Sequence, residues 1–216
     1  MSAIPSRTEG RAAGWVAAVH RFVRDDDTAQ RCELCSAWIA DAHQHLIEVP
    51  ARRLVCCCQA CALLFGHNDA AKYRTIPQRR DPLPDFRITD AQWDALAVPI
   101  NIAFFVRSSA RSGVMAFYPS PAGATESQLD LDAWQELEAG NPILAQLEPD
   151  TEALLVNRVE TARAYYRVSI DHCYQLVGLI RAGWHGVSGG TKVWEAIHQF
   201  FDALESGRSR EGQFHA

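Results

Sequence analysis

The chain has 216 residues, of which 48% are hydrophobic and 22% charged, and its formal net charge is −5 at pH 7. A chain of this size and composition can bury a core without disulfide or metal staples. The acidic balance gives no reason to expect nucleic acid as a partner. The longest apolar run, Leu96 to Val106, contains Pro99 and is too short for a membrane-spanning helix, which needs about 20 residues.

Residues 1–28 are expected to form an amphipathic N-terminal helix. Its apolar positions at helical spacing are Trp15, Val16, Val19, Phe22 and Val23. Glu9 in the charged region and the absence of a clear small-residue cleavage site argue against a signal peptide. We therefore expect a cytoplasmic protein, a compartment in which clustered thiols bind metals more often than they form disulfides. A disulfide interpretation would require an oxidising compartment that nothing in the sequence indicates.

Residues 29–67 carry the strongest chemical signal in the chain. Two C-x2-C pairs, Cys32 with Cys35 and Cys58 with Cys61, are separated by 22 residues. A C-x2-C pair on a tight turn lets two thiolates reach one ion, and two such turns complete a tetrahedron. The spacing predicts a four-cysteine metal site.

The residues between and after the pairs fit a small metal module. The segments "HQHLIEV" and "RRLVCC" can form a hairpin through "PA", and "ACALLF", which Gly66 ends, predicts a short helix. This ββα order is typical of treble-clef or zinc-ribbon-like modules. A helix that begins at the second pair would favour the thiolate forms of Cys58 and Cys61.

Three further residues are alternative ligands. Side chains alternate along a strand, so Cys56 and Cys58 point one way and Cys57 the other. Cys56 could therefore replace Cys58 or stand beside the site as an additional thiol. His43 and His45 share a strand face and could bind a second ion or substitute for a cysteine. The competing interpretation is that both histidines are polar residues on the exposed face of a hairpin.

Four thiolates can hold either Zn²⁺ or iron. Rubredoxin-type iron sites follow each cysteine pair with glycine, whereas this chain has Ser36 and Ala62 at those positions, which favours zinc. A closed four-cysteine zinc site has a structural role. The first alternative is a rubredoxin-like one-electron carrier with iron bound to the same four cysteines.

The second alternative is a nuclease. The segments "CELC", "AHQHL" and "RRLVCCCQAC" resemble the outline of His-Asn-His nucleases, which place a metal-binding histidine beside two C-x2-C pairs. The chain departs from that family because its histidines are close to the second pair and "ALLF" follows the last cysteine. It also carries no basic excess for phosphate contacts.

After the module we expect a linker or arm at residues 68–88, an α+β domain at 89–206 and a disordered tail at 207–216. Thr89 and Gln92 form the capping-box pattern of a helix start. The expected strands are residues 100–106, 114–118, 152–157 and 164–170, and the expected helices are residues 89–98, 129–140, 171–184 and 191–205. This order predicts a mostly antiparallel sheet with helices on one face.

No catalytic constellation is evident, so we do not expect an enzyme. Asp171, His172 and Cys173 are consecutive, and consecutive side chains of a helix point about 100° apart, so they cannot converge as a triad. Cys173 lies on an apolar stripe and is expected in the core. The segment Thr125 to Ser127 is expected in a loop, without a basic partner nearby in the sequence.

Several unrelated motifs together carry a resemblance to a known family. These are "CELC…HQHLIEVPARRLVCCCQACALLF", "FRITDAQWDAL", "FYPSPAGATES" and "CYQLVGLIRAGWHGVSGG". From Arg31 to Leu204 the chain resembles a family of uncharacterised bacterial proteins encoded beside actinobacterial-type uptake nickel–iron hydrogenases, with Cys57 as an addition. The resemblance implies a role in maturation, assembly or electron transfer, with a hydrogenase subunit or maturation factor as partner. We expect a non-enzymatic metal-binding accessory protein.

Overall fold

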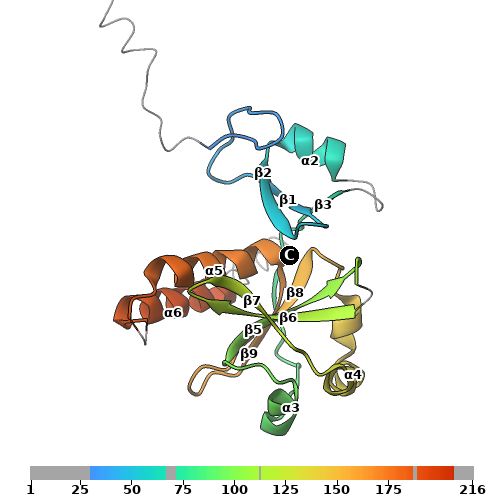
Figure 1. Cartoon of the computed structure of the whole chain (residues 1–216), viewed down its shortest axis with the longest axis vertical. Helices are drawn as coiled ribbons and strands as arrows, with labels where there is room; N and C mark the ends of the chain where they lie inside the picture. The colour runs from blue at the N-terminus through green and yellow to red at the C-terminus, as the bar shows by residue number, and fades with distance from the viewer. Residues whose placement is uncertain (1–29, 67–71, 112, 187–188, 207–216) are drawn as a thin grey trace, which may run out of the picture.

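The computed structural model describes residues 30–66, 72–111, 113–186 and 189–206. The expected helix at 1–28 and the expected tail at 207–216 lie outside these residues. The described chain forms a three-stranded sheet and a six-stranded sheet, both antiparallel, together with helices. Figure 1 shows the smaller sheet at one end of the molecule and the larger sheet with most of the helices at the other. The expected α+β class is confirmed.

The smaller sheet has the strand order β2-β1-β3. Strand β1 (Gln44–Glu48) and strand β2 (Arg53–Cys57) form the expected hairpin, and helix α2 (Gln59–Phe65) follows directly. Strand β3 (Tyr73–Thr75) pairs with β1 on the other side. The expected hairpin and helix therefore form one small layer around the cysteine pairs.

The close packing of α2 on β3 depends on Gly66. A Cβ atom at this position would lie 1.8 Å from Thr75 Oγ1 and 2.6 Å from the carbonyl oxygen of Ala62. We therefore expect Gly66→Ala to lower the free energy of unfolding by about 1–3 kcal/mol, because α2 must move away from β3. Chemical denaturation measures this change. Gly140→Ala is the matched control, since a Cβ there would meet no atom within 4 Å apart from its chain neighbours and the α4 backbone. An equal loss in both variants would contradict the steric explanation.

The larger sheet has the strand order β4-β9-β8-β5-β6-β7. Its strands are β4 (Arg80–Pro82), β5 (Ile102–Ser108), β6 (Gly113–Ser120), β7 (Gly123–Ser127), β8 (Glu152–Asn157) and β9 (Ala164–Ser169). The two expected hairpins are present, with Phe104 opposite Phe117 in one and Leu155 opposite Tyr166 in the other.

Two short elements differ from the sequence expectation. The segment 68–88, expected as a linker or arm, contributes β3 to the smaller sheet and β4 to the edge of the larger one. The segment expected as a loop around Thr125 forms β7, the opposite edge strand. Strands β3 and β4 have three residues each, so they are too short to show a strand period.

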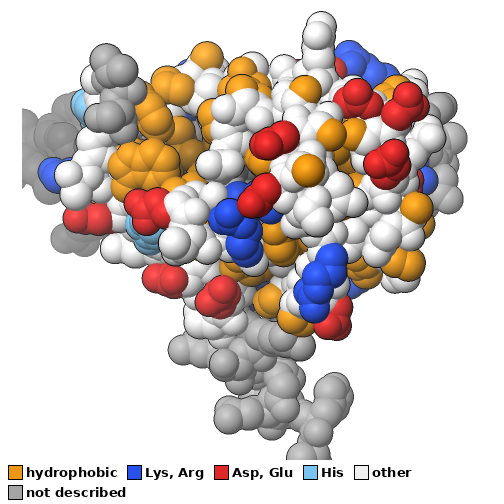
Figure 2. All heavy atoms as spheres, turned by 90° about the horizontal axis from the view of Figure 1, so that it is seen from below, with side chains coloured by type: hydrophobic (Ala, Val, Ile, Leu, Met, Phe, Trp, Pro, Cys, Tyr) orange, Lys and Arg blue, Asp and Glu red, His pale blue; other side chains and the backbone are white. Residues whose placement is uncertain are grey.

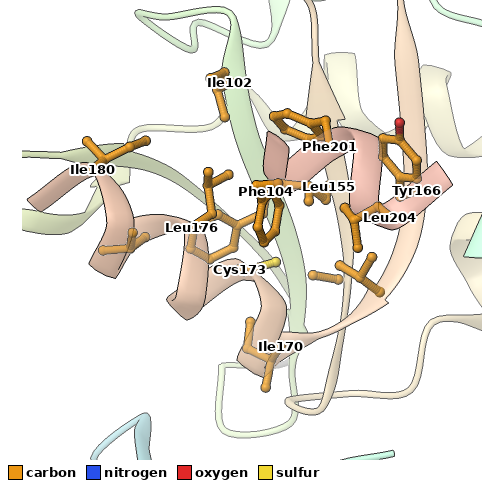
Figure 3. Packing of buried hydrophobic residues seen from close by; sticks show 14 of the residues in the cluster. Ile102, Phe104, Leu155, Tyr166, Ile170, Cys173, Leu176, Ile180, Phe201 and Leu204 are labelled. Carbon is orange, nitrogen blue, oxygen red and sulfur yellow. The ribbon is translucent and has the colours of Figure 1, made fainter. Parts of the chain in front are cut away.

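Helices cover both faces of the larger sheet. Helices α5 (Ile170–Gly183) and α6 (Thr191–Ser206) pack on one face, where Figure 3 shows Phe104 and Leu155 of the sheet with Leu176 and Phe201 of the helices. Helix α3 (Asp90–Ala95), helix α4 (Leu131–Gly140) and a 3₁₀ turn (Pro142–Gln146) pack on the other.

The expectation of helices on one face is thus wrong in this detail. Every residue from Ile102 to Val106 and from Glu152 to Asn157 is buried, so both faces of β5 and β8 need a cover. Helix α3 begins where the sequence predicts, because Thr89 and Gln92 form the complete capping box.

The smaller sheet packs directly on the larger one. Ile47 of β1 and Ile76, which follows β3, belong to the same hydrophobic cluster as Phe104 and Leu176. The hydroxyl of Tyr174 on α5 donates a hydrogen bond to the carbonyl oxygen of Arg52 at 3.0 Å. The two sheets therefore share one core, and the division into residues 29–67 and 89–206 remains a prediction.

Candidate metal centre

The first cysteine pair sits on a tight turn. The backbone N–H of Cys32 donates to the carbonyl oxygen of Ala37, and that of Ser36 donates to the carbonyl oxygen of Cys32, both at 2.8 Å. Ser36 has a positive φ of 61°, the left-handed conformation that lets the chain turn back. Cys32 is buried and Cys35 is exposed. The turn therefore presents one sulfur from the core side and one from the solvent side.

The second pair is positioned by the start of α2. Cys58 is the N-cap, and its sulfur accepts a hydrogen bond from the backbone N–H of Cys61 at 3.5 Å. The turn that carries Cys32 is tied to β2 by Glu33, whose backbone N–H donates to the carbonyl oxygen of Cys56 at 2.9 Å. The Glu33 carboxylate in turn accepts the backbone N–H of Cys56 at 2.8 Å. These contacts bring the two pairs together.

The sulfurs of Cys32, Cys35, Cys58 and Cys61 all lie within 4.8 Å of one another. The Sγ atoms of Cys35 and Cys58 are 3.7 Å apart. A tetrahedral zinc site with Zn–S bonds of about 2.3 Å separates its sulfurs by about 3.8 Å. The four-cysteine cluster therefore has the dimensions of a site that could hold a metal ion.

The cluster contains one readily ionised thiol. Burial opposes ionisation of Cys32, but hydrogen bonds from the backbone at Cys58, Cys35 and Leu34 outweigh it and lower its pKa to about 6. Burial and the neighbouring sulfurs raise the pKa of Cys61. Thiolates are the metal-binding form, and several of them in contact need a cation to offset their charge. Four sulfurs on one ion leave no open position for a reaction.

The alternative ligands do not join this cluster. His43, His45 and Cys56 form a second group, in which one ligand atom from each lies within 4.8 Å of the others. His45 and Cys56 are directly opposite in the β1–β2 hairpin. Cys56 thus stands beside the four-cysteine cluster, and the two histidines approach Cys56 instead of replacing a cysteine.

The other cysteines have structural surroundings. Cys57 is fully buried, and its sulfur donates to the carbonyl oxygen of Gln44 at 3.3 Å. Cys173 on α5 is fully buried in the hydrophobic cluster that α5 shares with α6 and the larger sheet, as its apolar stripe predicts. All seven cysteines are free thiols.

Asp171 is a polar neighbour of the second group that the sequence did not reveal. Its Oδ2 atom lies 3.2 Å from Nδ1 of His45, across 126 residues of sequence. Burial opposes ionisation, but hydrogen bonds from His172, His45 and Ser169 hold the Asp171 pKa far below its ordinary value. The "DHC" motif therefore contributes a carboxylate to the hairpin histidine. A contact between α5 and β1 leaves no signal in local periodicity.

The polar residues around Thr125 are used within the fold. Thr125 Oγ1 lies 2.9 Å from Ser120 Oγ. Glu126 pairs with Arg111 at 2.7 Å and with Arg52 at 3.3 Å, so it has the basic partners that its sequence neighbourhood did not show. Charge is mixed on the molecular face in Figure 2, where small groups of Lys and Arg side chains stand beside Asp and Glu.

Fold and site together define an α+β protein with a four-cysteine cluster in its N-terminal region, a donor set that could bind one metal ion. The chain belongs to a family of unknown function, DUF5947, whose sequence model matches residues 31–208. That description says nothing of hydrogenases. Comparisons with curated proteins and with solved structures found no match. Among the residues that the structure describes, no helix has both the length and the apolar character to cross a bilayer.

Proposed function

We propose that this protein is a non-enzymatic, zinc-binding accessory protein of the cytoplasm. In this proposal Cys32, Cys35, Cys58 and Cys61 hold one Zn²⁺ as a structural ion. The observation that carries it is the mutual approach of four sulfurs from two turns within 4.8 Å. The ion would hold the first turn, the hairpin and α2 in one arrangement, because its ligands come from the first turn and from the N-terminus of α2.

The metal is tested on protein purified from cells supplied with both zinc and iron. We expect zinc by elemental analysis and no visible absorption. The competing function, a rubredoxin-like one-electron carrier, predicts iron and a visible iron–thiolate band that bleaches on reduction. Such a band in the freshly purified protein would overturn the zinc assignment.

We further propose that the metal module presents a docking surface to a nickel–iron hydrogenase subunit or maturation factor. The family resemblance supports this partner, and exposed apolar side chains support the surface. Within the described residues, the large hydrophobic side chains exposed on the module are Trp38, Leu63, Leu64 and Phe65. Three of them lie on α2, which begins at the metal-binding pair, so zinc would orient them. Large apolar side chains left exposed close together in the chain are candidates for a partner surface.

A pull-down from a hydrogenase-containing host tests the surface. Leu64 is 76% exposed, so Leu64→Asp is expected to keep the fold and to reduce recovery of the hydrogenase component several-fold. Leu131→Asp on α4 is the matched control, because Leu131 is also exposed but lies on the larger domain. Deletion of the gene is expected to impair hydrogen uptake or subunit processing, and unchanged uptake and processing would refute the hydrogenase role.

A further inference from the structure

The β1–β2 hairpin gathers a second set of metal-binding side chains. His43 lies just before β1, His45 lies within it, and Cys56 is the residue opposite His45 on β2. Alternate residues of a strand share a face, and directly opposed residues of an antiparallel pair have adjacent side chains. The rings of His43 and His45 are 4.7 Å apart between centroids. One ligand atom of each of the three residues lies within 4.8 Å of the other two.

Hydrogen bonds leave one nitrogen of each histidine free to bind. Nδ1 of His43 lies 2.8 Å from the carbonyl oxygen of Ala40, and Nδ1 of His45 lies 3.2 Å from the carboxylate of Asp171. Both partners are acceptors, so each Nδ1 donates the hydrogen bond, and Nε2 of the neutral ring then presents a lone pair. Metal-binding histidines in proteins typically donate their other N–H to a carbonyl or carboxylate in this way.

The Nε2 atom of His43 supplies an independent observation. It is buried and has no hydrogen-bond partner in the described structure. A buried polar atom without a partner costs about 1–3 kcal/mol, and such atoms are rare in native proteins. A cation bound between His43, His45 and Cys56 would satisfy this lone pair.

We propose that His43, His45 and Cys56 form a second metal site, separate from the four-cysteine cluster, that binds a divalent transition-metal ion of the zinc and cobalt class. Two imidazoles and one thiolate suit these borderline-soft ions. Three protein ligands leave one tetrahedral position open, the arrangement of sites that exchange ligands. All three residues are partly exposed, although the His43 Nε2 atom itself is buried.

Two carboxylates contact the proposed ligands, and one of them connects the site to the larger domain. The Glu33 carboxylate accepts the backbone N–H of Cys56, and the Asp171 carboxylate holds His45. Asp171 belongs to the first turn of α5, which lies on the larger sheet (Figure 1). The bound ion would therefore link the hairpin to α5 through His45.

Metal counting on the full chain tests the second site. Protein equilibrated with Zn²⁺ and desalted is expected to retain two zinc ions per chain by elemental analysis. Cys56→Ser and His45→Ala should each retain one. His198→Ala is the matched control, because His198 is exposed on α6, and it should retain two. Cys61→Ser should lose the four-cysteine ion and keep the other.

Cobalt identifies the ligands and the open position. Co²⁺ bound at the second site should give a thiolate-to-cobalt charge-transfer band that disappears in Cys56→Ser. Added azide should shift the visible cobalt bands in the wild type, and an unchanged spectrum would exclude an open position.

The outcomes separate the two metal proposals. A wild type that holds one ion, lost in Cys61→Ser and kept in Cys56→Ser, would overturn the second site and leave the four-cysteine site intact. The reverse pattern would overturn the four-cysteine site alone.

Discussion

Cys61→Ser is expected to remove the four-cysteine zinc ion and to loosen α2 and the first cysteine turn, while the β1–β2 hairpin stays formed. Cys61 is 5% exposed in the first turn of α2, where its sulfur meets those of three other cysteines. Structural zinc contributes about 10–16 kcal/mol of apparent binding free energy in small modules. The loss of one thiolate therefore removes much of the stabilisation of α2 and the first cysteine turn, which supply the four ligands. Elemental analysis measures the ion, and hydrogen exchange of the α2 amides measures the loosening.

The matched control is Cys57→Ser, the same substitution beside a ligand. Cys57 is fully buried, but its sulfur bonds to a carbonyl oxygen and lies outside both metal groups. We expect this variant to retain all its zinc. The amides of β8 and β9, whose core residues pack on α5 and α6, should stay protected in both variants. Equal zinc loss in the two variants would contradict the assigned ligand set.

Glu152→Gln is expected to lower the free energy of unfolding by about 3 kcal/mol, the lower end of the range for breaking a buried ion pair. The carboxylate of Glu152 is 2% exposed and lies 2.5 Å from Nη2 of Arg167 and 2.6 Å from Nε of Arg79. It also accepts the backbone N–H of Glu148 at 3.0 Å. Glutamine keeps the shape but removes the counter-charge of Arg167, whereas Arg79 keeps its ion pair with Asp81 at 2.9 Å. The partial exposure of Arg79 limits the loss.

Thermal denaturation measures this effect, which corresponds to a decrease in Tm of roughly 6–12 °C for a chain of this size. Glu126→Gln is the control, because Glu126 also bridges two arginines but its side chain is 41% exposed. Solvent-exposed pairs contribute about 0–1 kcal/mol, so this variant should remain close to the wild type. Similar shifts in both variants would refute the role of burial.

The local features of the metal centre could be predicted because they depend on short segments. The C-x2-C spacing, the hairpin that returns through Pro50 and Ala51, and the helix that starts after Cys58 all follow from turn, strand and helix geometry over a few residues. The capping box at Thr89 is local for the same reason. Alternation along β2 also predicted that Cys56 and Cys57 point to opposite sides.

Other features required the folded chain. Helices cover both faces of the larger sheet because the central strands β5 and β8 are buried on both sides. The alternation of residues along a strand does not indicate whether its second face is also covered. The edge strands β3 and β4 have three residues each and depend on their partners β1 and β9.

The amino-acid sequence by itself determined the class of the fold and the pairing of cysteines into two turns. Both follow from the spacing of residues within a single helix, strand or turn. Tertiary structure alone decided that Cys56 faces His43 and His45, that Asp171 holds His45, and that Glu152 is buried between two arginines. These contacts join residues on different elements, and which faces meet depends on how whole sheets and helices pack. The spacing of residues within one element does not indicate which faces will pack together.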